Sequence, residues 1–116
     1  MKDDKLYLIH ITECLARIEQ YTIEGERAFF ADIKTQDAVL RNLQTLAEST
    51  QRLSSGLKAA YPEVDWYGIA GFRNILVHDY LGINLVRVWQ IVERDLPDLR
   101  CKIGVILREQ GIERKS

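Results

Sequence analysis

The sequence has little proline and little cysteine, and it carries no strong charge of either sign. Two prolines and seven glycines in 116 residues are too few for the many tight turns of a β-sandwich or β-barrel. A net charge of −1, from 16 basic and 17 acidic side chains, is not typical of a protein that binds nucleic acid over a broad basic surface. A nucleic-acid role would therefore depend on a local basic patch or on a brief catalytic encounter.

The two cysteines, Cys14 and Cys101, lie far apart in the sequence and form no CxxC pair. We interpret both as reduced thiols at buried helical positions of an intracellular protein. No segment approaches the ~20 apolar residues that a membrane-spanning helix needs, and the acidic residues near the N-terminus do not fit a signal peptide. The sequence therefore predicts a cytoplasmic protein with no membrane partner.

Apolar side chains recur every three or four residues along nearly the whole chain, which is the pattern of amphipathic helices. The periodicity predicts one helix from Asp3 or Asp4 to about Gly25, a short piece at 26–34, and longer helices over 35–57, 63–81 and 84–110. Apolar residues make up 47% of the chain, enough for a packed core. We predict an all-α, up-and-down bundle of four or five helices, forming a single domain over 1–116 with a frayed tail at 111–116.

Particular residues mark the ends of these predicted helices. Thr35 and Asn84 are candidate N-caps, because their side chains can accept hydrogen bonds from free N–H groups of the first turn. Pro97 predicts a kink or a short break in the last helix. Phe29 and Phe30 are expected to cover the core.

One stretch of the third long helix carries more polar chemistry than a core helix needs. Residues 73–80 read Arg-Asn-Ile-Leu-Val-His-Asp-Tyr. At about 100° per residue, Asn74 and His78 share a helix face, whereas Arg73 and His78 are about 140° apart. A site that uses both needs a long reach from the arginine, a distorted last turn, or a second copy of the chain. An imidazole such as that of His78 can take up and release protons near neutral pH.

This stretch resembles the Arg–four-residue–His motif of HEPN domains (higher eukaryotes and prokaryotes nucleotide-binding). It is most similar to the HepT-like toxin family, in which a tyrosine follows two residues after the histidine. Arg73, His78 and Tyr80 have that spacing. The resemblance covers essentially the whole chain, including Trp66 before the motif and Trp89 after it. It implies a helical bundle of the HEPN type.

The resemblance also implies a metal-independent endoribonuclease that works as a homodimer, with two copies of the motif lining a cleft between the chains. His78 would move a proton at the RNA 2′-hydroxyl or at the 5′-oxygen leaving group, and Arg73 would hold the scissile phosphate. The expected products are a 2′,3′-cyclic phosphate and a 5′-hydroxyl. Asn74 is a candidate supporting residue, and so is Glu48 on the neighbouring helix. The sequence shows no evident cluster of metal ligands, so we expect no metal and no cofactor.

A protein partner follows from the same resemblance. HepT-like toxins are paired with a small, MntA-like nucleotidyltransferase antitoxin, which transfers AMP from ATP to the motif tyrosine. By this likeness Tyr80 is the expected modification site. Added AMP would place negative phosphate beside Arg73 and His78, which would repel RNA.

Less specific interpretations of the same residues stay open. His78 can be a hydrogen-bonded histidine at a helix end, and Arg73 can form an ion pair with Glu48 or Asp79. We interpret four aromatic residues as core or dimer interface rather than as a surface for stacking bases: Trp66, Tyr67, Phe72 and Trp89. The near-neutral charge also fits an alternative function, a non-catalytic subunit that binds a nucleotidyltransferase.

Overall fold

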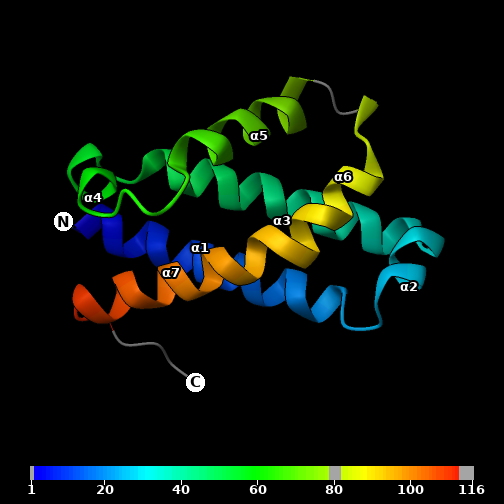
Figure 1. The fold of residues 1–116 in the computed structure, drawn as a ribbon, viewed down its shortest axis with the longest axis horizontal. Coiled ribbons are helices and arrows are strands. Elements are labelled where there is room, and N and C mark those ends of the chain that lie inside the picture. Colours follow the sequence, from blue (N-terminus) through cyan, green and yellow to red (C-terminus); the bar gives the residue numbers. More distant parts are fainter. Residues whose placement is uncertain (1, 79–81, 113–116) are drawn as a thin grey trace.

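The computed structural model describes residues 2–78 and 82–112, which form a bundle of helices (Figure 1). Its long elements are α1 (Lys2–Tyr21), α3 (Ile33–Arg52), α5 (Trp66–His78) and a final rod made of α6 (Leu85–Gln90), η2 (Ile91–Asp95) and α7 (Leu96–Glu109). The short helices α2 (Glu26–Ala31) and α4 (Ser55–Ala60) lie in the connections. Within the described ranges there is no strand, and none of the helices is both long and apolar enough to cross a membrane. The predicted all-α fold class is confirmed.

The helix α3 occupies the centre of the bundle because it carries apolar side chains toward two neighbours. It packs along α1 on one side and against α5 on another, and α7 lies against α1. Figure 1 shows this order, with α5 along the upper edge of the bundle above α3. The apolar stripes predicted for the first two long helices are buried: Leu8, Ile11, Leu15 and Ile18 on α1, with Val39, Leu43, Leu46 and Ala47 on α3.

The beginning of α3 differs from the sequence prediction. Asp32, rather than Thr35, is the N-cap: its side chain accepts a hydrogen bond from the Lys34 N–H at 3.1 Å. The Thr35 hydroxyl donates to the other Asp32 oxygen at 2.8 Å, so it supports the cap from inside the helix. Of the two predicted core aromatics, Phe29 is fully buried, but Phe30 is 38% exposed and stacks with its ring nearly perpendicular to that of Phe29.

The final rod contains the predicted joint. Asn84 caps α6 as predicted, since its side chain accepts from the N–H groups of Val86 and Arg87. The segment η2 is a π-helical turn, in which the Leu96 N–H bonds to the Ile91 carbonyl five residues back. Pro97 explains this widened turn, because it has no N–H to donate and its ring crowds the carbonyl four residues earlier.

The helix α7 is followed by a glycine in the left-handed conformation. Gly111 has φ 69°, and the Ile112 N–H bonds to the Leu107 carbonyl at 2.9 Å, a common way of ending a helix. Of the segment predicted to be a frayed tail, 111–116, residues 113–116 lie outside the described residues.

The two cysteines occupy different environments. Cys14 is buried in the core as predicted, and burial raises the pKa of its thiol. Cys101 is exposed, so the prediction that it is buried is wrong. Its helix turns Leu99, Ile103 and Ile106 toward the core, and residue 101 falls on the opposite face.

A buried carboxylate ties the start of α1 to the junction between α3 and α4. Asp4 is only 7% exposed and accepts two hydrogen bonds from Ser54, one from the N–H at 2.7 Å and one from the hydroxyl at 2.6 Å. The Ser54 hydroxyl oxygen in turn caps α4 by accepting from the Leu57 N–H. Burial alone would raise the pKa of the Asp4 carboxyl, but the Ser54 hydrogen bonds outweigh it, and the pKa lies below its ordinary value.

We predict that Asp4→Ala lowers the free energy of unfolding by about 1–3 kcal/mol, because it leaves a part-buried N–H without its acceptor. Asp3→Ala is the matched control, since Asp3 lies in the same first turn but is exposed. Because folding lowers the pKa of Asp4, its contribution to the free energy of unfolding is present above about pH 4. That contribution is lost as the pH falls through the folded-state pKa. Urea unfolding of wild type and both variants at pH 7 and pH 3 measures this. Equal losses for the two variants at pH 7 would contradict it.

Candidate active site

The helix that carries the motif, α5, is fixed at its start by two side chains. The Trp66 indole N–H donates to the carbonyls of Lys58 and Tyr61, at 3.2 and 3.0 Å. Asp65 accepts from the Gly68 N–H at 2.9 Å and so satisfies a free donor of the first turn. A Cβ at position 68 would lie 2.3 Å from the Asp65 carboxylate, which explains the glycine there. The helix therefore begins at Trp66 rather than at the predicted residue 63.

The packing of α5 is one-sided. It lies on α3, and Leu76 is its one buried residue among those described. Several apolar side chains of the same helix remain in the open: Tyr67 is 91% exposed, Ile75 51% and Val77 38%. An apolar helix that leaves this much of its surface uncovered is typical of an interaction surface.

The structure places Arg73 and His78 on different sides of α5. Arg73 is half-buried, whereas His78 is exposed in the last turn of the helix. No hydrogen bond joins them among the described residues, as expected from their angular separation. The exposed Asn74 is the neighbour of Arg73: its side-chain oxygen accepts from the Arg73 Nη1 at 3.4 Å. The Arg73 Nε is buried and has no hydrogen-bond partner in the part of the chain that is described.

The other predicted site residues are not brought to the motif by any contact that the structure describes. Glu48 is half-buried on α3 and accepts a hydrogen bond from the Gln44 amide at 3.0 Å. Within 2–78 and 82–112 it forms no ion pair with Arg73. Asp79 and Tyr80 lie outside the described residues.

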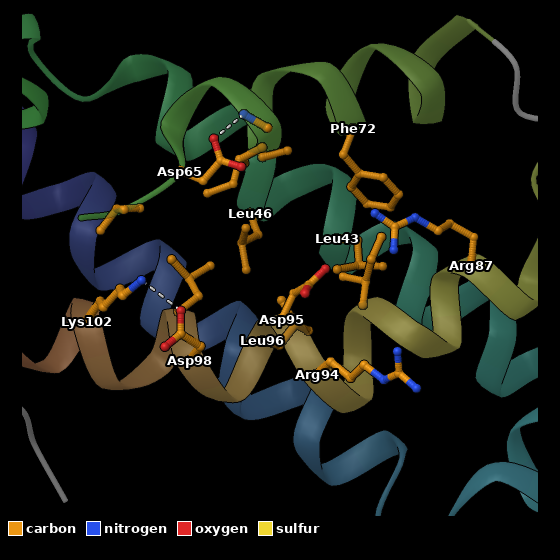
Figure 2. Close-up of a pocket in the computed structure, with 16 residues that line it drawn as sticks. Leu43, Leu46, Asp65, Phe72, Arg87, Arg94, Asp95, Leu96, Asp98 and Lys102 are labelled. Atoms are coloured by element: carbon orange, nitrogen blue, oxygen red, sulfur yellow. Dashed lines mark hydrogen bonds and ion pairs between the residues drawn. The ribbon is translucent and has the colours of Figure 1, made fainter. Parts of the chain in front are cut away.

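A groove that sequence reasoning missed runs beside the motif. Its volume is about 570 Å³, and it lies between α5 and the final rod, with α3 beneath it (Figure 2). The walls are apolar, and charged side chains stand along them. A signal for it exists in the sequence: Arg87, Ile91, Arg94, Asp98 and Lys102 recur every three or four residues, which places charged groups on a single face of the final rod.

Comparison with known proteins identifies the family. The sequence model of the family described as "Ribonuclease HepT-like" matches residues 11–106, a range that contains the whole motif. This chain is a member of the ribonuclease HepT-like family. The membership confirms the resemblance seen in the sequence and places the chain among ribonucleases.

Individual relatives agree with the family match. A protein of Thermococcus cleftensis named as a probable ribonuclease HepT is 34% identical over 102 residues, which cover 87% of this chain and 93% of the relative. The mRNA nuclease HepT of Shewanella oneidensis is 30% identical over 132 residues, covering 85% of this chain and 92% of the relative. No solved structure matches this HepT-like chain.

One relative is a longer protein. It comes from Methanocaldococcus jannaschii, is named as a gamma-glutamylcyclotransferase and candidate RNase, and is 36% identical over 109 residues. These residues are 93% of this chain but 49% of the relative, so the HepT-like chain spans about half of that protein. The roles of Arg73, His78, Asn74, Glu48 and Tyr80 stay predictions, because these matches concern whole chains rather than single side chains.

Proposed function

We propose that this chain is a metal-independent endoribonuclease toxin that cuts RNA by attack of a 2′-hydroxyl, at a site that Arg73 and His78 form where two chains meet. The observation that carries the proposal is the placement of the motif. In a chain of the ribonuclease HepT-like family, Arg73 and His78 lie on α5, a helix that exposes the apolar side chains of Tyr67, Ile75 and Val77.

The chemistry needs only the two side chains and the RNA itself. The His78 imidazole takes the proton from the 2′-hydroxyl, or protonates the 5′-oxygen as it leaves. The 2′-oxygen bonds to phosphorus, and the bond from phosphorus to the 5′-oxygen breaks. The Arg73 guanidinium stabilises the negative charge that develops on the phosphate oxygens. The products are a 2′,3′-cyclic phosphate and a 5′-hydroxyl, so a strand without the 2′-hydroxyl is not a substrate.

A second copy of the chain resolves the angular problem of the motif. On one helix the half-buried Arg73 and the exposed His78 diverge. In a symmetric dimer, the histidine of one chain can face the arginine of the other across the interface. The outer face of α5 suits such a contact, since it exposes Tyr67 and Ile75. Gly71 lies on this face, where an added Cβ would meet nothing in the single chain, so a partner helix has room to approach closely.

Regulation by a partner is the second part of the proposal. A nucleotidyltransferase antitoxin transfers AMP from ATP to the Tyr80 hydroxyl: the phenolic oxygen bonds to the α-phosphorus, and pyrophosphate leaves. Tyr80 follows His78 by two residues, so the added phosphate stands beside the site. Its negative charge competes with the RNA phosphate for Arg73.

We predict that the purified wild type cuts single-stranded RNA in the presence of EDTA. Arg73→Ala and His78→Ala each lower the rate by at least about 100-fold, because each removes a group that acts on the reacting phosphate or its neighbouring oxygens. Arg27→Ala and His10→Ala are the controls, since they remove the same side-chain types from α1 and α2. Gel analysis of a labelled RNA gives the rates, and mass spectrometry identifies the cyclic phosphate.

Sedimentation of each variant shows whether its assembly is kept. A wild type that leaves RNA intact while it still binds a nucleotidyltransferase would contradict the ribonuclease proposal and favour the non-catalytic subunit.

We predict that incubation with the nucleotidyltransferase partner and ATP raises the intact mass of the chain by one or more AMP units. Tyr80→Phe abolishes the increase because the acceptor oxygen is gone. Tyr67→Phe is the matched control, since Tyr67 is 91% exposed and lies on the same helix as the motif. Loss of modification in Tyr67→Phe alone, or an unchanged mass of the wild type, would contradict the assignment to Tyr80.

A further inference from the structure

The charged groups along the groove are engaged at one end and not at the other. At one end, Asp65 caps α5, and Asp98 forms an ion pair with Lys102 at 2.8 Å. At the other end the Arg87 side chain reaches into the groove, whereas Arg94 points to the side of the rod away from α5 (Figure 2). Arg87 forms no ion pair with any carboxylate of the described residues, so its guanidinium group is available to a ligand.

An aromatic ring faces this guanidinium group. Figure 2 shows the Arg87 side chain reaching from α6 toward the ring of Phe72 on α5, across the groove. Phe72 is half-buried, so one part of the ring is held by the protein while another part borders the groove. An exposed part of an aromatic ring beside a guanidinium is a common arrangement for binding a nucleotide, with the base stacked and the phosphate paired.

A single carboxylate sets the orientation of such a ligand. The exposed Asp95 of η2 points into the groove between its two ends (Figure 2). Its negative charge repels a phosphate in the middle of the groove. Its carboxylate oxygens can accept hydrogen bonds from the N–H groups of a base. The phosphate then lies toward Arg87, and the edge of the base lies toward Asp95.

We propose that this groove is a subsite for one RNA nucleotide next to the cut, with its base stacked on Phe72 and its phosphate on Arg87. The inference rests on the proposed ribonuclease function and adds the residues that bind the strand away from the reacting phosphate. Phe72 packs partly against the core, as the sequence interpretation expected, and the rest of its ring borders the groove. A local positive group also reconciles RNA binding with a net charge of −1.

The position of the groove supports RNA as its occupant. Phe72 immediately precedes Arg73, and Arg87 lies on the helix that follows the motif. A strand held at the motif can therefore continue into the groove. At roughly 570 Å³, the groove has the size of a small-ligand site.

Burial argues against a second copy of the chain in this place. The apolar side chains of α3 beneath the groove are already covered: Leu43 is 2% exposed and Leu46 is 3% exposed. An apolar partner would gain little by covering them again, because the hydrophobic gain depends on the area removed from water. The uncovered apolar side chains of α5, such as Tyr67, do not line the groove.

The test measures binding of a fluorescent single-stranded RNA with 2′-O-methyl groups, which blocks attack by the 2′-hydroxyl. Arg87→Gln should weaken binding by about 10-fold and flatten the slope of log affinity against log salt by about 0.7, because one phosphate contact is lost. Phe72→Leu should weaken binding by about 5- to 10-fold with an unchanged slope, because it removes stacking and no charge. The matched control is Arg108→Gln, an exposed arginine of α7 that does not line the groove, and it should bind like the wild type.

Two results would overturn the proposal. One is equal affinity and equal salt slope for Arg87→Gln and wild type. The other is a change in the sedimentation coefficient of the RNA-free protein on Arg87→Gln, which would show that the groove holds a second copy. Since Arg87 is exposed, its replacement does not depend on repacking the core, unlike that of Phe72. A wild type that binds this RNA through Arg87 but cuts no RNA would contradict the proposed ribonuclease activity and leave the subsite intact.

Discussion

The packing of α5 against α3 is the contact on which the rest of the structure depends. The buried Leu76 and the half-buried Ile69 and Phe72 pack α5 on the core. Asp65 caps the start of the helix, and the Trp66 indole ties that start to carbonyls at the end of α4. Because the helix is covered on one side, it presents two different surfaces. One borders the groove above α3, and the other is an apolar outer face that no described residue covers. A helix buried on all sides could carry the same motif, but neither RNA nor a second chain could reach it.

These two surfaces divide the proposed work of the protein. In our proposal the groove, with Phe72 and Arg87, binds the strand beside the cut. The outer face would meet a second chain, which would bring together an arginine and a histidine that diverge on one helix. Both proposed roles depend on α5, because apolar and polar side chains alternate around this helix and only one side of it is covered. By this proposal a chain with little net charge acts on RNA through a few placed groups, Arg73 and His78 at the cut and Arg87 in the groove, rather than through a broad basic surface.

Sequence periodicity predicted the long helices and most of the core, because burial in a bundle recurs every three or four residues. The residue types of Asn84 and Pro97 also predicted a cap and a joint correctly, since both effects act within one turn of the backbone. Two sequence predictions were wrong: Thr35 is not the N-cap of α3, and Cys101 is not buried. Asp32 lies three residues before Thr35 and starts the helix there by accepting from the Lys34 N–H, and the orientation of Cys101 depends on which face of α7 meets α1. The groove was missed because it is formed by residues of three elements, whose side-by-side placement is a tertiary property.

A mixed dimer shows whether two chains share the catalytic groups, as we propose. Chains carrying Arg73→Ala and His78→Ala are produced together with different tags, and dimers that hold one chain of each kind are purified. If Arg73 of one chain acts with His78 of the other, we expect this mixed dimer to recover about half of the wild-type rate, because one arginine still faces one histidine across the two-fold axis. Each variant paired with itself stays inactive. A mixed dimer as inactive as its two parents would show that Arg73 and His78 act within one chain, and would contradict the account.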